Sequence, residues 1–233
     1  MSNITTVGVI GLGNAGAPIL NNLNKSNKYK LVAFDIDTKK LNDIPKNIIK
    51  ATSIKTLAEQ CNVVLTCLPK PEHVLKAVDG KDGLLQNAST GMVWIDTSTT
   101  NFKQTQELAR NASTFGVSML EATLTGGVHA LQNNNMVCLA GGDEDTFKLW
   151  KEVLQDAIGE VVVLCGKVGA GAIAKVVSNM LAFTNMVAAS ECMMIAKKAG
   201  LDLENFFDAI RVSAGNSFAW ETVVPHIFNQ KYE

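Results

Sequence analysis

The 233-residue sequence has little net charge, few histidines and few charged side chains, and each shortage excludes a class of function. Its 21 basic and 22 acidic residues give a formal charge of -1, so no general attraction to nucleic acid or to an anionic membrane is expected. The three histidines have no metal-ligand spacing, and we expect no metal site. Charged residues make up 18% of the chain and hydrophobic residues 47%, which predicts a substantial core and some apolar surface buried against a partner subunit.

The sequence also lacks paired cysteines and a targeting segment. No C-x-x-C pair occurs among its five cysteines, which are odd in number and fall in expected strands and helices; they are Cys61, Cys67, Cys138, Cys165 and Cys192. This predicts reduced core thiols in a cytoplasmic protein. No basic and apolar leader opens the chain, because a strand-like run starts within the first ten residues. The most apolar stretch, 180–196, contains Asn185 and Glu191, so we expect a buried helix and not a membrane span.

Short β-rich runs alternate with helical patterns over the first two thirds of the chain. We expect strands at 5–10, 31–34, 63–68, 92–95, 137–140 and 161–164, and helices at 14–25, 52–60, 72–78, 102–114 and 145–154. This alternation predicts an α/β fold with a Rossmann-type, doubly wound parallel sheet covered by helices on both faces.

The alternation stops near Val168. The chain then has neither proline nor glycine from Ala172 to Lys198, and Gly200 supplies a stop signal. This pattern predicts a helix that exceeds the mean helix length of about 11–12 residues and is unlike a crossover helix. We therefore expect two domains, a sheet domain at 1–167 and an incomplete all-helical domain for substrate and dimerisation at 168–233.

A glycine-rich loop follows the first expected strand. The stretch Gly11-Leu12-Gly13-Asn14-Ala15-Gly16 fits G-x-G-x-x-G, opens a helix, and precedes Asp35 at the end of the second strand. Together these elements are the context for dinucleotide binding, with the diphosphate at the helix start and the carboxylate on the adenosine ribose. Asp35 would repel a 2′-phosphate, and Ile36 beside it offers no arginine, so we predict NAD over NADP. The alternative is a plain strand–turn–helix corner.

Lys175 and Asn179 stand out because they are polar residues in an otherwise apolar helix. Four residues apart, they share one helical face. The lysine could snorkel, with its ammonium in solvent. The other possibility is that it works in a cleft next to a positively charged nicotinamide, where its pKa would be lowered. Values of about 7–8 suit acid/base lysines in general.

Five motifs in order give the chain a resemblance to the β-hydroxyacid dehydrogenase family, from Val7 to about Pro225. Gly11–Pro18 is similar to G-L-G-x-M-G-x-P, with Ala15 in place of methionine, and 67–73 resembles the L-P loop. The segment 96–99 resembles D-x-S-T, and 121–127 resembles D-A-P-V-S-G-G. The stretch 169–179 is similar to G-x-G-x-x-x-K-x-x-N-N.

The resemblance implies a role for each matching residue. It makes Lys175 the catalytic lysine and Asn179 a substrate contact, and it implies that Thr125, Gly126 and Gly127 hold the substrate carboxylate. It also implies cofactor contacts at Leu68, Pro69, His73 and Thr99. Backbone N–H groups at 125–127 could cradle a carboxylate.

The match has departures. Glu121 and Thr123 replace aspartate and proline, Thr125 replaces serine, and Ser178 replaces the first of the paired asparagines. Members of the family also continue beyond Glu233, into helices that include a K-D-L motif.

Three hypotheses for function follow. The leading one is NAD-dependent oxidation of a small 3-hydroxy acid to its semialdehyde, or the reverse, with Lys175 as general acid/base in a homodimer or higher homo-oligomer. The second is a related imine or carbonyl reductase, against which the lysine argues. The third is a nucleotide-binding or oligomerising module with impaired catalysis.

Overall fold

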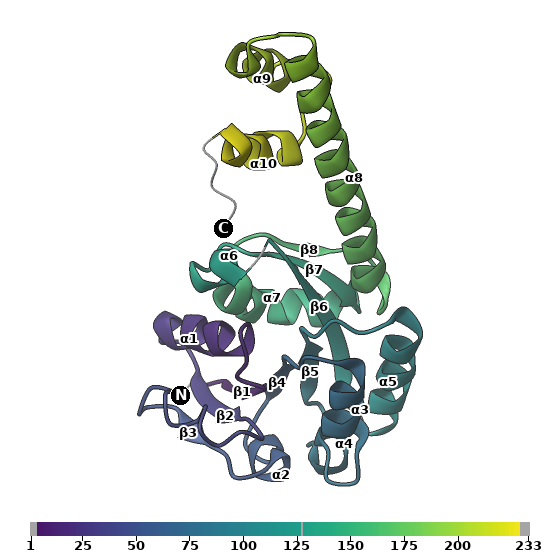
Figure 1. The fold of residues 1–233 in the computed structure, drawn as a ribbon. Coiled ribbons are helices and arrows are strands. Elements are labelled where there is room, and N and C mark those ends of the chain that lie inside the picture. Colours follow the sequence, from purple (N-terminus) through teal and green to yellow (C-terminus); the bar gives the residue numbers. More distant parts are fainter. Residues whose placement is uncertain (1–3, 127, 229–233) are drawn as a thin grey trace. The chain divides into compact units, whose positions relative to one another are not determined.

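The computed structural model of the protein describes residues 4–126 and 128–228. The chain divides into two compact units, Met1–Lys175 and Val176–Glu233. The first unit is built around one eight-stranded sheet, and the second is helical (Figure 1).

The sheet has the order β3-β2-β1-β4-β5-β6-β7-β8. Its strands are β1 (Thr6–Ile10), β2 (Lys30–Phe34), β3 (Ile49–Lys50), β4 (Val63–Thr66), β5 (Val93–Asp96), β6 (Ser118–Thr125), β7 (Val137–Gly142) and β8 (Val162–Leu164). The first six strands follow the strand order of a dinucleotide-binding fold, so the Rossmann-type prediction is confirmed.

One pair departs from the expected parallel arrangement. β7 runs antiparallel to β6, while all other neighbouring strands are parallel. Antiparallel neighbours need no long crossover, and only residues 126–136 connect these two strands. Two strands, β3 and β6, were not expected. β3 has only two residues, and Glu121 and Thr123 interrupt the apolar run of β6.

Helices cover both faces of the sheet, as predicted (Figure 1). On one face Val7 and Val9 pack with side chains of α1, α6 and α7, and on the other Ile10 and Trp94 pack with α2 to α5. The helices are α1 (Gly16–Ser26), α2 (Ile54–Ala58), α3 (Pro71–Asp79), α4 (Leu84–Asn87), α5 (Phe102–Thr114), α6 (Val128–Gln132) and α7 (Glu144–Ile158).

The second unit has its own small core. It contains most of α8 (Ala170–Lys198), which begins in the first unit, and all of α9 (Leu203–Arg211) and α10 (Phe218–Phe228). Met193, Trp220 and Val224 are buried together, and the Trp220 ring lies 5.8 Å from that of Phe206. The long helix predicted from Gly171 is therefore present.

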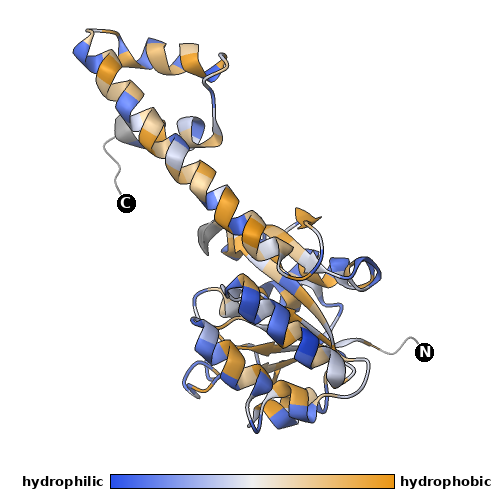
Figure 2. Ribbon diagram, turned by 90° about the vertical axis from the view of Figure 1, so that its right-hand side faces the viewer, coloured by the Kyte–Doolittle hydropathy of each residue, from blue (hydrophilic) through white to orange (hydrophobic). Residues whose placement is uncertain are grey.

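The prediction that the 180–196 stretch is buried is wrong. The side chains of Met180, Leu181 and Phe183 are 68%, 57% and 60% exposed, and apolar residues recur along α8 (Figure 2). By length and composition alone α8 is long and apolar enough to cross a membrane. Packing in a single copy of the described chain does not cover this helix.

The cysteines are free, but only some are core residues. Cys61 and Cys138 are buried, and burial raises the pKa of each thiol to about 12. Cys165 and Cys192 are exposed, so the prediction of core thiols is wrong for these two. Cys165 follows the last strand of the sheet, and Cys192 lies on the apolar but uncovered α8.

Candidate active site

Most of the expected site residues lie at one edge of the sheet. Strand register aligns Ile10, Phe34, Thr66 and Asp96 in one row, each the last residue of its parallel strand. The glycine loop, Asp35 and the loops after β4 and β5 therefore leave the sheet at the same edge. Ligands of open α/β sheets bind at this carboxyl edge.

The glycine loop is shaped by close backbone contacts. Gly11 has a φ of +95°, and a Cβ there would lie 2.4 Å from the Cys67 carbonyl oxygen. A Cβ on Gly16 would lie 1.8 Å from the Gly11 oxygen, so the start of α1 sits directly on the loop. Gly13 faces open space, and Ala15 gives α1 no side-chain cap. A helix start that lacks an acidic cap and lies behind an open loop fits a diphosphate.

Asp35 is buried and already holds the loop in place. Its Oδ2 accepts a hydrogen bond from the Leu12 N–H at 2.6 Å, and its Oδ1 accepts one from the Asp37 N–H at 2.8 Å. Lys40 Nζ lies 3.2 Å from Oδ2. Burial works to raise the pKa of Asp35, but these three donors outweigh it and lower the pKa, so the carboxylate is charged. Ile36 is 87% exposed beside it.

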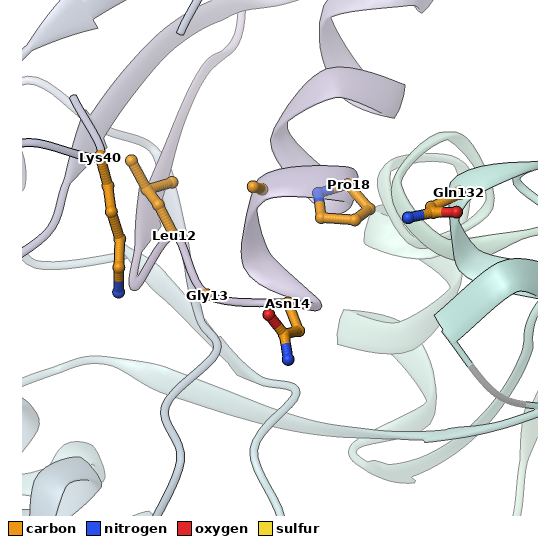
Figure 3. Close-up of a pocket in the computed structure, with 7 residues that line it drawn as sticks. Leu12, Gly13, Asn14, Pro18, Lys40 and Gln132 are labelled. Carbon is orange, nitrogen blue, oxygen red and sulfur yellow. The ribbon is translucent and has the colours of Figure 1, made fainter. Parts of the chain in front are cut away.

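Lys40 was not expected from the sequence. It lines a groove of about 440 Å³ together with residues of the glycine loop, α1 and α6 (Figure 3). The lining residues are Leu12, Gly13, Asn14, Ala17, Pro18, Lys40 and Gln132. The Lys40 ammonium therefore lies in this groove beside the Asp35 carboxylate, which is expected to exclude a 2′-phosphate.

Hydrogen bonds tie together the loops after β4 and β5. The Leu68 N–H donates to Ser98 Oγ at 2.9 Å, and Thr97 Oγ1 donates to the Thr66 carbonyl oxygen at 2.8 Å. Pro69 and His73 are exposed, the latter in the first turn of α3. Thr99, the residue after Ser98, is also exposed.

A fully buried carboxylate lies behind these loops. Asp96 Oδ1 accepts hydrogen bonds from Thr66 Oγ1 at 2.7 Å and from the Ser98 N–H at 3.1 Å, and Trp94 Nε1 donates to Thr66 Oγ1 at 2.9 Å. Burial raises the pKa of Asp96, although the hydrogen bonds from Ser98 and Thr66 oppose this. Asp96 therefore fixes the loop that presents Thr99.

Lys175 reaches this edge of the sheet from the start of α8. Its Nζ donates a hydrogen bond to Thr99 Oγ1 at 3.3 Å, and its side chain is half-buried. Burial lowers the pKa of Lys175, and the nearby Cys67 opposes this shift. Asn179 follows one helical turn later on α8, in the second unit.

The expected carboxylate-binding segment follows β6. Thr125 is the last residue of that strand and pairs with Val137, and Gly126 has a φ of +127°, which favours glycine. Gly127 lies outside the described residues. β6 extends four residues past the row of strand ends, so Thr125 projects beyond it on the same side.

Glu121 and Thr123, noted in the sequence only as departures, are buried. Glu121 accepts hydrogen bonds from three backbone N–H groups around the start of α8, and the Thr123 hydroxyl lies 3.1 Å from the Gly171 carbonyl oxygen. No signal in the sequence linked these strand residues to the helix of Lys175. Within residues 4–126 and 128–228, no cluster of His, Cys, Asp or Glu could hold a metal ion.

Family models match both parts of the chain. One, described as the NAD binding domain of 6-phosphogluconate dehydrogenase, matches residues 6–166. Another, described as NAD-binding of NADP-dependent 3-hydroxyisobutyrate dehydrogenase, matches residues 169–233. The chain belongs to the β-hydroxyacid dehydrogenase family.

Relatives in the β-hydroxyacid dehydrogenase family resemble the chain over nearly its whole length. The mitochondrial 3-hydroxyisobutyrate dehydrogenases of mouse and human are each 32% identical to it, over 97% and 95% of this chain. The matches cover 67% and 66% of the mouse and human proteins, so the chain spans about two thirds of their length. The structure of 3-hydroxyisobutyrate dehydrogenase from Mycobacterium tuberculosis with L-serine is similar with a TM-score of 0.87, at 30% identity, over 94% of this chain and 74% of that one.

Proposed function

We propose that the protein is an NAD-dependent dehydrogenase that interconverts a small 3-hydroxy acid and its semialdehyde, with Lys175 as general acid/base. The observation that carries the proposal is the contact of Lys175 Nζ with Thr99 Oγ1. It puts a half-buried lysine with a lowered pKa at the carboxyl edge of the sheet, where the glycine loop and Asp35 also lie. The names of the similar dehydrogenases support the same reaction class.

The proposed mechanism divides the work among the residues of this chain. Bound NAD would supply the hydride acceptor. The neutral amine of Lys175 takes the proton of the substrate hydroxyl during oxidation, and its ammonium returns one during reduction. Thr99 accepts a hydrogen bond from Lys175 and so fixes the direction of Nζ. In this scheme Asn179 orients the hydroxyl, and Thr125 with Gly126 and Gly127 holds the carboxylate.

The cofactor is proposed to be NAD because the Asp35 carboxylate is charged where a 2′-phosphate would lie. The cofactor contacts proposed from the sequence lie beyond β4 and β5 at this edge, with Leu68 and Pro69 on the loop after β4, His73 in the first turn of α3, and Thr99 on the loop after β5. Lys40 works against this preference for NAD, because its positively charged Nζ lies 3.2 Å from Asp35 Oδ2. Cytoplasmic location and homo-oligomerisation stay predictions.

A panel assay tests the reaction. Purified protein is mixed with NAD and with 3-hydroxyisobutyrate, glycerate, 3-hydroxypropionate or 4-hydroxybutyrate, and NADH absorbance is followed. L-Serine, which the similar M. tuberculosis enzyme was solved with, extends the panel. We expect NADH formation with at least one 3-hydroxy acid, and much slower NADH formation with the Lys175→Ala variant. NADH binding without turnover of any substrate would instead favour the nucleotide-binding module, and imine reduction without alcohol oxidation would favour the reductase.

A further inference from the structure

The start of α8 is held by a carboxylate from another element. Glu121 lies in β6 and is 2% exposed. Its Oε2 accepts hydrogen bonds from the N–H groups of Gly169 and Gly171 at 2.9 and 3.0 Å, and its Oε1 accepts one from Ala172 at 2.8 Å. A side chain from a distant strand thus does what an N-cap residue does in other helices.

The surroundings of this carboxylate leave little freedom. A Cβ on Gly141 of β7 would lie 2.6 Å from Glu121 Oε2, and a Cβ on Gly171 would lie 2.6 Å from the Leu139 carbonyl oxygen. The backbone of the first turn of α8 therefore sits directly on β6 and β7. Burial raises the pKa of Glu121, and the three N–H donors and the positive end of the helix oppose this shift.

Lys175 follows this anchored turn at helical spacing. It is four residues after Gly171 and three after Ala172, so it lies on the face of α8 that carries the two donors. With about 1.5 Å of rise per residue, the Lys175 backbone is only about 6 Å along the helix from Gly171. A shift of the first turn therefore also moves the backbone that carries the Lys175 side chain.

We propose that Glu121 is a positioning residue that holds α8 so that Lys175 Nζ stays beside Thr99. The expected effect of Glu121 on turnover rests on the proposed function. Its expected effect on the position of Lys175 does not. A misplacement of about 1 Å costs roughly 10²-fold in rate, so the three hydrogen bonds matter for turnover even though Glu121 does not touch the substrate.

The test replaces the carboxylate and follows Lys175 directly. In Glu121→Gln the amide keeps one acceptor but turns an NH₂ donor toward backbone donors. Competitive labelling of lysines with acetic anhydride across pH, read by mass spectrometry, gives the pKa of Lys175. We expect this pKa to rise toward the ordinary lysine value, because a freed helix start exposes Nζ to water. We also expect kcat to fall by roughly 10–10²-fold with NADH affinity unchanged.

Asp143 supplies a matched control. Its carboxylate caps α7, accepting from the Thr146 N–H at 2.9 Å and from Thr146 Oγ1 at 3.0 Å, but α7 carries no proposed site residue. Asp143→Ala, which removes this acceptor, should lower thermal stability and leave both Lys175 labelling and kcat as in the parent. NADH binding shows that each variant is folded, and Glu121→Asp, shorter by one methylene, replaces Glu121→Gln if the latter does not bind.

The outcomes separate the two proposals. A Glu121 variant that binds NADH while the pKa of Lys175 and kcat both stay unchanged overturns the positioning role. Equal changes in Asp143→Ala also overturn it, because any loss of a helix cap would then have the same effect. If the parent protein shows no turnover but the pKa of Lys175 still rises in Glu121→Gln, the positioning role is supported and the proposed reaction is not.

Discussion

At the residue scale, Lys175 owes its proposed role to burial and to one hydroxyl partner. The pKa of its ammonium is lowered because it is half-buried, and no carboxylate lies within ion-pair distance to oppose this in the described chain. A lysine with a lowered pKa loses its proton at a lower pH than a surface lysine does. Oxidation of the alcohol should therefore gain rate as the pH rises through this lowered pKa, below the ordinary value of 10.5.

The first prediction concerns Lys175 itself. Lys175→Ala should lower kcat/KM with the hydroxy acid by about 10²–10⁴, the range for a general acid–base group, with NAD affinity nearly unchanged. Lys175→Arg should not restore activity, since a guanidinium stays protonated. Lys197→Ala, in the last turn of the same helix, is the control and should behave as the parent. Full activity in Lys175→Arg would show that the lysine is only a packing residue.

The second prediction concerns Asp35 and Lys40. Asp35→Ala removes the charge that repels a 2′-phosphate and frees the Lys40 ammonium, so the ratio of NADPH to NADH affinity should rise at least about tenfold, since like-charge contacts cost several kcal/mol. Adding Lys40→Ala should remove most of that gain. Fluorescence titration of both reduced cofactors measures the ratio. Equal or tighter binding of NADPH to the parent would contradict the assignment of NAD.

Sequence patterns identified the residues at strand ends but missed those that work across elements. Gly11 and Asp35 were predicted because a phosphate loop demands fixed spacing along the chain. Glu121 was noted only as a departure from a family motif, because its partners at 169–172 are about 50 residues away. Lys40 was missed because a lysine five residues past a strand is ordinary, and only the folded loop brings it to Asp35.

At the element scale, side chains cap the starts of helices, and the sequence reveals such a cap only when it lies next to the helix along the chain. Asn101, the residue before α5, accepts a hydrogen bond from the Gln104 N–H at 2.9 Å, and α5 spans the predicted residues 102–114. The start of α8 has its carboxylate partner on a strand instead. Local patterns therefore predict the limits of α5, whereas the anchoring of α8 needs the whole sheet.

The third prediction tests the α5 cap. Asn101→Ala should lower the free energy of unfolding by about 1 kcal/mol, the usual cost of losing an N-cap side chain. Asn101→Asp keeps an acceptor at the same place and should retain stability. Urea unfolding followed by circular dichroism measures both. A loss in the aspartate variant as large as that in the alanine variant would argue against capping as the cause.

At the scale of the whole molecule, the second unit leaves a large apolar surface uncovered. Its core is small, and along α8 the side chains of Val176, Met180, Leu181 and Phe183 are all more than half exposed. Exposed apolar patches of this kind are unusual in monomers. The long helix was predicted correctly from its lack of breakers, but its exposure could not be, because composition does not say what surrounds a helix.

The fourth prediction is that α8 mediates a homodimer or higher homo-oligomer. Light scattering on the parent at micromolar concentration should give at least twice the mass of one chain. Phe183→Glu should shift the protein toward monomer, because a charge would be buried in the interface. Leu149→Glu, at a residue 73% exposed on α7, is the control and should not change the mass. A monodisperse monomeric parent would count against the prediction.

The two ends of the sheet bear on aggregation. The edge strands, β3 with two residues and β8 with three, are the shortest in the described sheet, and the longest strand, β6, is paired on both sides. Short edges offer few free backbone groups for another chain to extend as a strand, and Lys50 on β3 adds a charge there. Concentrated samples of the folded protein should consequently associate through side chains rather than form fibrils by strand addition, and thioflavin T should stay dark while the protein remains native.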